Sequence, residues 1–295
     1  MNELRIDALL PQEMASRAEL LGVRKAEMPF LKMFMLAILA GAFISLGAIF
    51  ATTVGAGSIA IAASSGETAF TTGFPYGFNR LLVGLVFCLG LILVVVGGAE
   101  LFTGNNLIVM AWANGKVTGR ALLRNWAIVY IGNFVGSIGT VILMFLTKQY
   151  TFGANSIGIA ALRTGVAKVE LTFLQAIALG ILCNALVCLA VWLTYSARST
   201  IDKIAAIVFP ITAFVAAGFE HSVANMYFIP YALFIKYFDP TYVAAVGDRV
   251  ANLDKLTWST FLWNNLLPVT IGNIIGGAVL VAAVYWAIFL RAPKS

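Results

Sequence analysis

Residues 218–225 read GFEHSVAN, and they interrupt a long apolar stretch of the chain. From Ile204 to Ile235 the only charged residue is Glu220, and His221 beside it is the only histidine among 295 residues. Ionisable side chains are costly inside a bilayer unless they are buried in protein or line a polar path. The stretch therefore indicates a functional break in a membrane-spanning helix.

The rest of the chain has the composition of an integral membrane protein. Hydrophobic residues make up 61% of it and charged residues 11%, against about 45–50% and about 25% in soluble domains. Runs without Asp, Glu, Lys or Arg suit helical spans of about 20 residues, whereas barrel strands would alternate polar and apolar residues. We expect an all-α membrane protein with six transmembrane helices. The expected spans are 31–54, 81–114, 122–147, 171–196, 204–236 and 258–290.

Two of these spans have unusual lengths. Residues 81–115 are interrupted only by Glu100. Residues 204–235 are interrupted only by Glu220. Each stretch is longer than one span of about 20 residues but too short for two spans and a loop. We therefore predict that the second and fifth helices are broken near mid-membrane.

Short sequence matches relate the two halves of the chain. GAELFTGN at 98–105 shares the pattern G-x-E-x-x-x-x-N with 218–225. In the same order, IGNFVGS at 131–137 matches IGNIIGG at 271–277. With three spans in each half, the halves must cross the membrane in opposite directions, as inverted repeats whose broken helices meet at a midplane site. The expected repeats are about 31–147 and 171–290.

The distribution of cations indicates the orientation. Six spans leave both termini on one side, and that side receives the larger share of the 19 Lys and Arg residues. The positive-inside rule therefore puts both termini in the cytoplasm. We expect residues 1–30 to form a cytoplasmic segment with a short amphipathic helix at 11–28. Residues 31–290 would form a single transmembrane channel domain, and 291–295 a cytoplasmic tail.

Several classes of function lack support. The three cysteines fall inside apolar runs and are expected to be packing residues; they are Cys88, Cys183 and Cys188. With one histidine and no H-E-x-x-H motif, we expect no metal, no cofactor and no enzymatic Glu–His centre. The net charge of +6 is spread over the loops, which is typical of membrane topology and not of nucleic-acid binding.

Several segments closely resemble the formate/nitrite transporter family. They are GGAELFTGN at 97–105, LCNALVCLAVWLTYSARS at 182–199, GFEHSVANMYFIP at 218–230 and LLPVTIGNIIGG at 266–277, with the segment 8–26 most similar to the family's formate channels. The resemblance implies an aquaporin-like fold and a homopentamer with one pore in each protomer. It also implies transport of small monovalent anions or their acids: formate, nitrite, hydrosulfide, acetate and lactate.

The same resemblance implies roles for particular residues. The first break would be the family's Ω-shaped loop at 100–106, with Thr103 as its polar tip, and the second would carry His221 into the middle of the pore. Lys168 would line one vestibule, and Lys25 is its weaker counterpart on the inner side. The residues that match the narrow, apolar parts of the family's pore are Phe87, Leu91, Phe102, Val187 and Phe214.

The imidazole of His221 could reduce the cost of moving an anion through an apolar passage. Moving an anion into a narrow apolar passage costs several kcal/mol in desolvation, and a proton or a cationic ring at the midpoint would reduce that cost. We expect His221 to neutralise the anion by proton transfer or charge pairing, with the Thr103 hydroxyl as a second donor. The plainer alternative is a core histidine satisfied by Glu220.

Other polar residues are expected along the same path. Glu220, and Glu100 in the other half, are predicted to accept backbone N–H groups left unpaired at the helix breaks. Three asparagines are expected to bridge loops and helices beside the path: Asn184, Asn225 and Asn273.

The choice of substrate remains open at this point. Formate is favoured by the overall likeness to formate channels, and nitrite or hydrosulfide is the alternative within the family. A neutral-solute channel of the aquaporin type would require paired N-P-A tripeptides, and the chain has none.

Overall fold

The computed structural model describes residues 7–57, 59–62, 68–72 and 75–291. This part of the chain is helical apart from one β-hairpin, β1 (Ile59–Ala62) with β2 (Thr68–Thr72). Six helices are long and apolar enough to cross a membrane. They are α2 (Phe30–Gly55), α3 (Tyr76–Gly97), α5 (Gly119–Leu146), α7 (Phe173–Ser196), α8 (Thr200–Ala217) and the composite helix Trp258–Phe289. The predicted all-α fold with six spans is confirmed.

Both predicted breaks are present. Helix α3 ends where Gly98 turns to φ 82°, and the chain resumes as the 3₁₀ helix η1 (Gly104–Ile108) and α4 (Val109–Ala113). Helix α8 ends where Gly218 turns to φ 77°, and the chain resumes as α9 (Ser222–Phe238). Glycine is the residue that adopts this left-handed conformation without a Cβ penalty. The two glycines of the G-x-E pattern therefore end two helices in the same way.

The last span is built from segments of different pitch. Its parts are α11 (Trp258–Thr260), the π-helix η5 (Phe261–Leu266), α12 (Leu267–Ile274), the π-helix η6 (Ile275–Ala283) and α13 (Val284–Phe289). Short elements complete the fold: η2 (Gln149–Thr151), α6 (Ser156–Val169), α10 (Pro240–Val246), η3 (Gly247–Arg249) and η4 (Leu253–Lys255). Helices α6 and α10 lie in connections where the sequence predicts no helix.

The N-terminal helix α1 (Pro11–Ala26) belongs to the helical bundle. Met14 and Ala18 are buried in one cluster with residues of η1 and α4. Arg17 Nη1 donates to the carbonyl of Tyr195, 3.0 Å away, at the end of α7. The predicted helix at 11–28 is present, two residues shorter, and one of its faces packs on protein.

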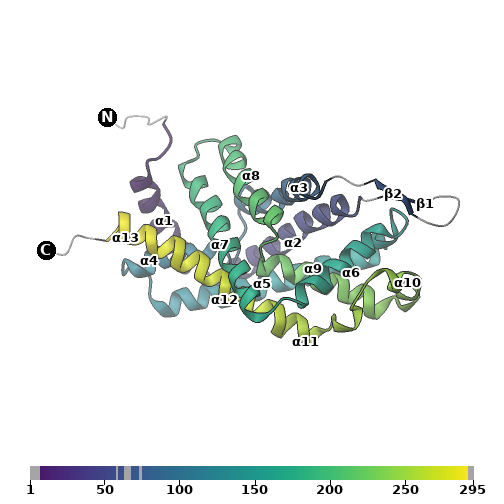
Figure 1. The fold of residues 1–295 in the computed structure, drawn as a ribbon. Helices are drawn as coiled ribbons and strands as arrows, with labels where there is room; N and C mark the ends of the chain where they lie inside the picture. The colour runs from purple at the N-terminus through teal and green to yellow at the C-terminus, as the bar shows by residue number, and fades with distance from the viewer. Residues whose placement is uncertain (1–6, 58, 63–67, 73–74, 292–295) are drawn as a thin grey trace.

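The two ends of the molecule differ (Figure 1). The two chain termini lie at one end, together with α1, α4 and α13, while the β-hairpin, α6 and α10 lie at the other. We call these the termini end and the hairpin end. The three cysteines are buried and free, as the packing prediction requires.

Glycines of the repeated I-G-N-x-x-G motif let helices approach closely. A Cβ at Gly136 of α5 would overlap the carbonyl of Ile38 in α2, and a Cβ at Gly276 of η6 would overlap the carbonyl of Ile181 in α7. Small residues at such positions allow backbones to touch. The repeated motif therefore records the same helix packing in both halves.

We expect Gly136→Ala to destabilise the protein, because the backbone of α2 must move to admit the methyl group, at a cost of about 1–3 kcal/mol. The matched control is Gly139→Ala on the same helix, where an added Cβ meets nothing within 4 Å. The measurement is the temperature at which half of the detergent-purified protein aggregates. Equal temperatures for the two variants would show that this contact does not limit stability.

Candidate functional site

The two breaks meet at one hydrogen bond. Thr103 Oγ1 lies 2.9 Å from Nε2 of His221. Thr103 is fully buried and His221 is 2% exposed. Residues predicted from opposite halves of the chain, 118 positions apart, are therefore brought into direct contact at the centre of the bundle.

The histidine ring is oriented from both sides. His221 caps the N-terminus of α9, where its Nδ1 accepts the backbone N–H of Ala224 at 3.0 Å. A ring nitrogen that accepts a backbone N–H carries no proton itself, so we assign the proton of the neutral ring to Nε2. The ring of Phe214 stacks on the imidazole with centroids 5.9 Å apart. Nε2 is thus the nitrogen presented to Thr103.

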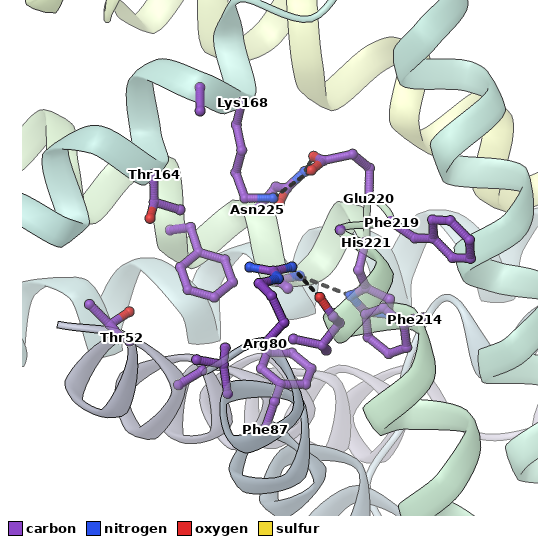
Figure 2. Close-up of a pocket in the computed structure, with 18 of the residues that line it drawn as sticks. Thr52, Arg80, Phe87, Thr164, Lys168, Phe214, Phe219, Glu220, His221 and Asn225 are labelled. Atoms are coloured by element: carbon purple, nitrogen blue, oxygen red, sulfur yellow. Dashed lines mark hydrogen bonds and ion pairs between the residues drawn. The ribbon is translucent and has the colours of Figure 1, made fainter. Parts of the chain in front are cut away.

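A charged network lies next to the histidine at the hairpin end (Figure 2). Lys168 Nζ donates to Glu220 Oε1 at 2.7 Å. Glu220 Oε2 accepts the side-chain amides of Asn225 at 2.7 Å and Asn265 at 3.1 Å. Glu220 is 4% exposed. This buried carboxylate is therefore compensated by one ammonium group and two amides.

The same network recurs at the termini end. Lys25 Nζ donates to Glu100 Oε1 at 2.7 Å. Glu100 Oε2 accepts from Asn105 at 2.7 Å, and Asn105 also donates to Asn125 Oδ1 at 3.0 Å. Each member has its counterpart in the other half of the chain. The inverted repeat thus includes α1, which supplies Lys25, and α6, which supplies Lys168.

The backbone at the breaks is held by asparagines. Asn133 accepts the N–H of Phe102 at 2.9 Å and donates to the carbonyls of Ala37 and Glu100 at 2.8 and 2.9 Å. The prediction that the two carboxylates accept the free N–H groups is wrong at this point. The glutamates instead bind lysine and asparagine side chains, because a carboxylate beside an ammonium group is better compensated than one facing a single amide.

The second half repeats this arrangement atom for atom. Asn273 accepts the N–H of Ser222 at 2.9 Å and donates to the carbonyls of Gly180 and Glu220, both at 2.9 Å. Asn184 then donates to the carbonyl of Asn273 at 2.7 Å and, at 3.3 Å, to that of Thr103. Asn184 therefore connects the two breaks.

Two cavities approach the Thr103–His221 pair from opposite ends. The one at the hairpin end has a volume of about 410 Å³, and its lining includes Arg80, Lys168, Glu220 and His221. The one at the termini end has a volume of about 290 Å³, and its lining includes Arg17, Lys25, Glu100 and Lys203. The chain thus presents, on each side of a buried centre, a cavity whose lining includes charged side chains.

The five predicted constriction residues are all buried, at 1–3% exposure: Phe87, Leu91, Phe102, Val187 and Phe214. Phe87 and Phe214 line the hairpin-end cavity, with ring centroids 5.8 Å apart in an edge-to-face contact. Leu91 lines the termini-end cavity. Phe102 packs on Tyr130 with centroids 4.9 Å apart, and neither Phe102 nor Val187 lines either of these two cavities.

Several residues of the site escape the sequence analysis. They are Arg17, Arg80, Leu101, Asn105, Asn125, Asn133, Lys203 and Asn265. Some of them could have been found from the offsets of 120 and 140 residues that relate the matching motifs of the two halves. Adding 120 to Leu101 gives His221, and adding 140 to Asn125 and Asn133 gives Asn265 and Asn273. The arginines carry no such signal.

Comparison with known proteins identifies relatives across almost the whole chain. The model of the family described as formate/nitrite transporter matches residues 12–287. The formate channel FocA of Escherichia coli (strain K12) is 47% identical over 286 residues, which cover 97% of this chain and 96% of that protein. A probable formate transporter of Methanothermobacter thermautotrophicus is 37% identical over 295 residues, covering 95% of this chain and 97% of that protein.

A solved structure described as a pentameric formate channel with formate bound has the same fold. It superposes with a TM-score of 0.77 and is 45% identical in sequence. The match covers 89% of this chain and 98% of that chain.

We expect Asn273→Leu and Asn133→Leu to destabilise the protein to a similar degree. Each leaves a buried N–H and two carbonyls without a partner, at about 1–3 kcal/mol for each unsatisfied group. The matched control is Asn264→Leu in the same span, whose exposed amide makes only a 3.5 Å contact. Thermal aggregation in detergent measures the three effects. A control variant as unstable as Asn273→Leu would contradict the assignment.

Proposed function

The chain belongs to the formate/nitrite transporter family, and we propose that it is a formate channel in which the anion passes from one cavity to the other by way of His221 and Thr103. Membership of this family makes the chain a multi-pass membrane transport protein, in agreement with the prediction that it is not an enzyme. Formate is supported by two matches at 45% identity or more, a relative named as a formate channel and a solved structure with formate bound.

The observation that carries the proposal is the buried Thr103–His221 pair between two cavities whose linings include charged side chains. An anion that leaves either cavity loses its hydration and meets apolar side chains, at a cost of several kcal/mol. The pair offers a hydroxyl and an imidazole N–H at the point where the cost is greatest. Hydrogen bonds to a charged group are stronger than those between neutral groups, so the pair lowers the barrier where it would otherwise peak.

His221 is the residue that neutralises the anion in this mechanism. Its Nδ1 is occupied by the amide of Ala224, so only Nε2 faces the path. To carry a positive charge the ring must take a second proton on Nδ1, which requires Nδ1 to release the N–H of Ala224. The imidazolium can then transfer its Nε2 proton to a formate oxygen, which leaves a neutral ring and neutral formic acid, or it can remain charged and pair with the anion. Either step removes the net charge from the passage. Thr103 holds the second oxygen through its hydroxyl.

The charged networks prepare the anion for this step. Lys168 at one end and Lys25 at the other would offer donors to an arriving carboxylate, and Glu220 and Glu100 hold each ammonium group in place. The buried aromatic and aliphatic residues next to the centre exclude water there, which strengthens the electrostatic contacts inside.

The oligomeric state and the orientation in the membrane are inferred from a structural relative and from the loop charges. We propose a homopentamer in the inner membrane, because the structural relative is described as pentameric. The excess of cations on the loops of the termini end supports cytoplasmic termini.

Uptake into proteoliposomes tests the substrate and the role of His221 together. We expect wild-type protein to carry formate with protons, seen as a change of internal pH, and His221→Phe to lose that coupling because the ring nitrogens are gone. Nitrite and hydrosulfide are compared at equal concentrations. If nitrite or hydrosulfide moves faster than formate, that ion is the better candidate for the substrate. If His221→Phe still carries protons with formate, His221 has no part in the mechanism.

A second variant tests the hydroxyl. Thr103→Val keeps the side-chain volume but removes the group that contacts His221, and we expect formate flux to fall about 5- to 30-fold, the factor for 1–2 kcal/mol. The matched control is Thr52→Val, which lines the hairpin-end cavity and whose hydroxyl bonds to the carbonyl of Ala48 in its own helix. Equal flux in the two variants would show that Thr103 is a packing residue only.

A further inference from the structure

Lys168 and Lys25 do not supply a net positive charge to the cavities that they line. Lys168 forms an ion pair with Glu220, and Lys25 forms one with Glu100, both at 2.7 Å. Two paired charges produce only a weak field at a distance, because the contributions of opposite sign cancel. The attraction of an anion into the hairpin-end cavity must therefore come from another group.

That group is Arg80. The charged residues in the lining of the hairpin-end cavity are Arg80, Lys168 and Glu220. With Lys168 and Glu220 cancelling each other, one positive charge is left, on the guanidinium. In the part of the chain that the structure describes, Arg80 forms an ion pair with no carboxylate.

Arg80 is fixed at the second helix break. Its Nε donates to the carbonyl of Ala216 at 3.1 Å, and its Nη2 donates to the carbonyl of Val215. These carbonyls belong to the last turn of α8, five or six residues before His221. In Figure 2 the side chain rises from α3 into the cavity and ends beside the residues of this turn.

This position has an electrostatic consequence. The C-terminus of a helix carries about half a negative charge on its unpaired carbonyls, and Val215 in the last turn of α8 lines the cavity that leads to His221. An anion moving toward the histidine would meet that negative end. The guanidinium placed on it reverses the sign of the local charge.

We propose that Arg80 is the anion-receiving residue of the hairpin-end cavity, a site for a small monovalent carboxylate such as formate. Its guanidinium cancels the negative end of α8 and turns its remaining donors to the anion before the anion reaches His221. A guanidinium carries five N–H donors, and Nη1 has no acceptor among the described residues. The inference rests on the proposed function, since it names the residue that receives the same substrate.

In the termini-end cavity a different arginine lies at the negative end of a helix. Its charged lining is Arg17, Lys25, Glu100 and Lys203, so two positive charges remain after the Lys25–Glu100 pair cancels. Arg17 donates to the carbonyl of Tyr195, next to the last residue of α7. At both ends a guanidinium that has no carboxylate partner among the described residues therefore rests on a helix C-terminus.

The test is the concentration dependence of formate uptake by vesicles that expose the hairpin end. Arg80→Gln removes the charge but keeps an amide that can donate to the carbonyls of α8. At about 10 mM salt of a large, impermeant anion, where charges act over about 30 Å, we expect its half-saturating formate concentration to be about three- to tenfold that of wild type. In about 1 M of the same salt the difference should disappear, because screening shortens that range to about 3 Å.

Further variants separate charge from folding. Arg80→Lys keeps the charge and should keep the wild-type half-saturation at low salt. Arg249→Gln, on the same end but outside the cavity, is the control for general surface charge. Thr164→Glu places a carboxylate in the cavity lining without touching the cap on α8; it should act like Arg80→Gln, while the uncharged Thr164→Gln should not. This second pair decides the question if Arg80→Gln does not fold.

The outcomes are distinct. One outcome, in vesicles where wild type carries formate, is that Arg80→Gln and Thr164→Glu have the same half-saturating formate concentration and the same salt dependence as wild type. That result would overturn the role of Arg80 and leave the proposed function standing. A fall in maximal flux alone, equal at low and high salt, would make Arg80 a structural cap and also overturns it. Wild-type vesicles that take up formate no faster than empty vesicles overturn the proposed function itself.

Discussion

The structure depends on satisfying broken backbone inside an apolar bundle. Where a span stops and restarts at mid-membrane, its amide and carbonyl groups have no water to bind, and each unsatisfied group costs several kcal/mol in hydrocarbon. Asn133 and Asn273 meet this requirement: each uses its acceptor and one donor on the break of its own half and the second donor on a neighbouring helix, α2 or α7. An asparagine side chain carries both functions within one group, which no carboxylate or ammonium offers. The close glycine contacts of α5 and η6 are what bring these amides within reach.

Once the backbone is held, charge can be brought to the breaks. Each glutamate lies within a break and is matched by a lysine from a separate short helix, α1 or α6, and by an asparagine five residues later in the chain. Their charges largely cancel, so they give rigidity and local donors more than a long-range field. The long-range field comes from the cations of the linings that are left after these pairs cancel: Arg80 at the hairpin end, and Arg17 with Lys203 at the termini end. Rigidity and attraction are thus assigned to different residues.

Much of this was accessible from the sequence, and the reasons for the gaps are physical. Hydropathy and the two G-x-E-x-x-x-x-N patterns predicted the spans, the breaks and the position of His221. Helix α6 was missed because its residues, with glycines at 158 and 165, form a helix that is held by packing on α9 more than by its own pattern. The lysine–glutamate pairs were missed because the partners lie 75 and 52 residues apart, so no single spacing shared by the two halves indicates them. The carboxylates were matched to the wrong donors because a pattern shows which groups need partners, not which partners reach them.

The position of Leu101 has a consequence for the ancestry of such a chain. The lysine–glutamate pairs and the asparagines Asn105, Asn125 and Asn133 have twins in the other half, yet His221 corresponds to Leu101, which is 2% exposed. A channel assembled from two identical, separately encoded repeats would have the same side chain at both positions, either two imidazoles or none. A single imidazole becomes available when the two copies can diverge site by site, as they can once they are fused in one polypeptide. Duplication could supply the scaffold, whereas the asymmetric centre required the two halves to differ in sequence.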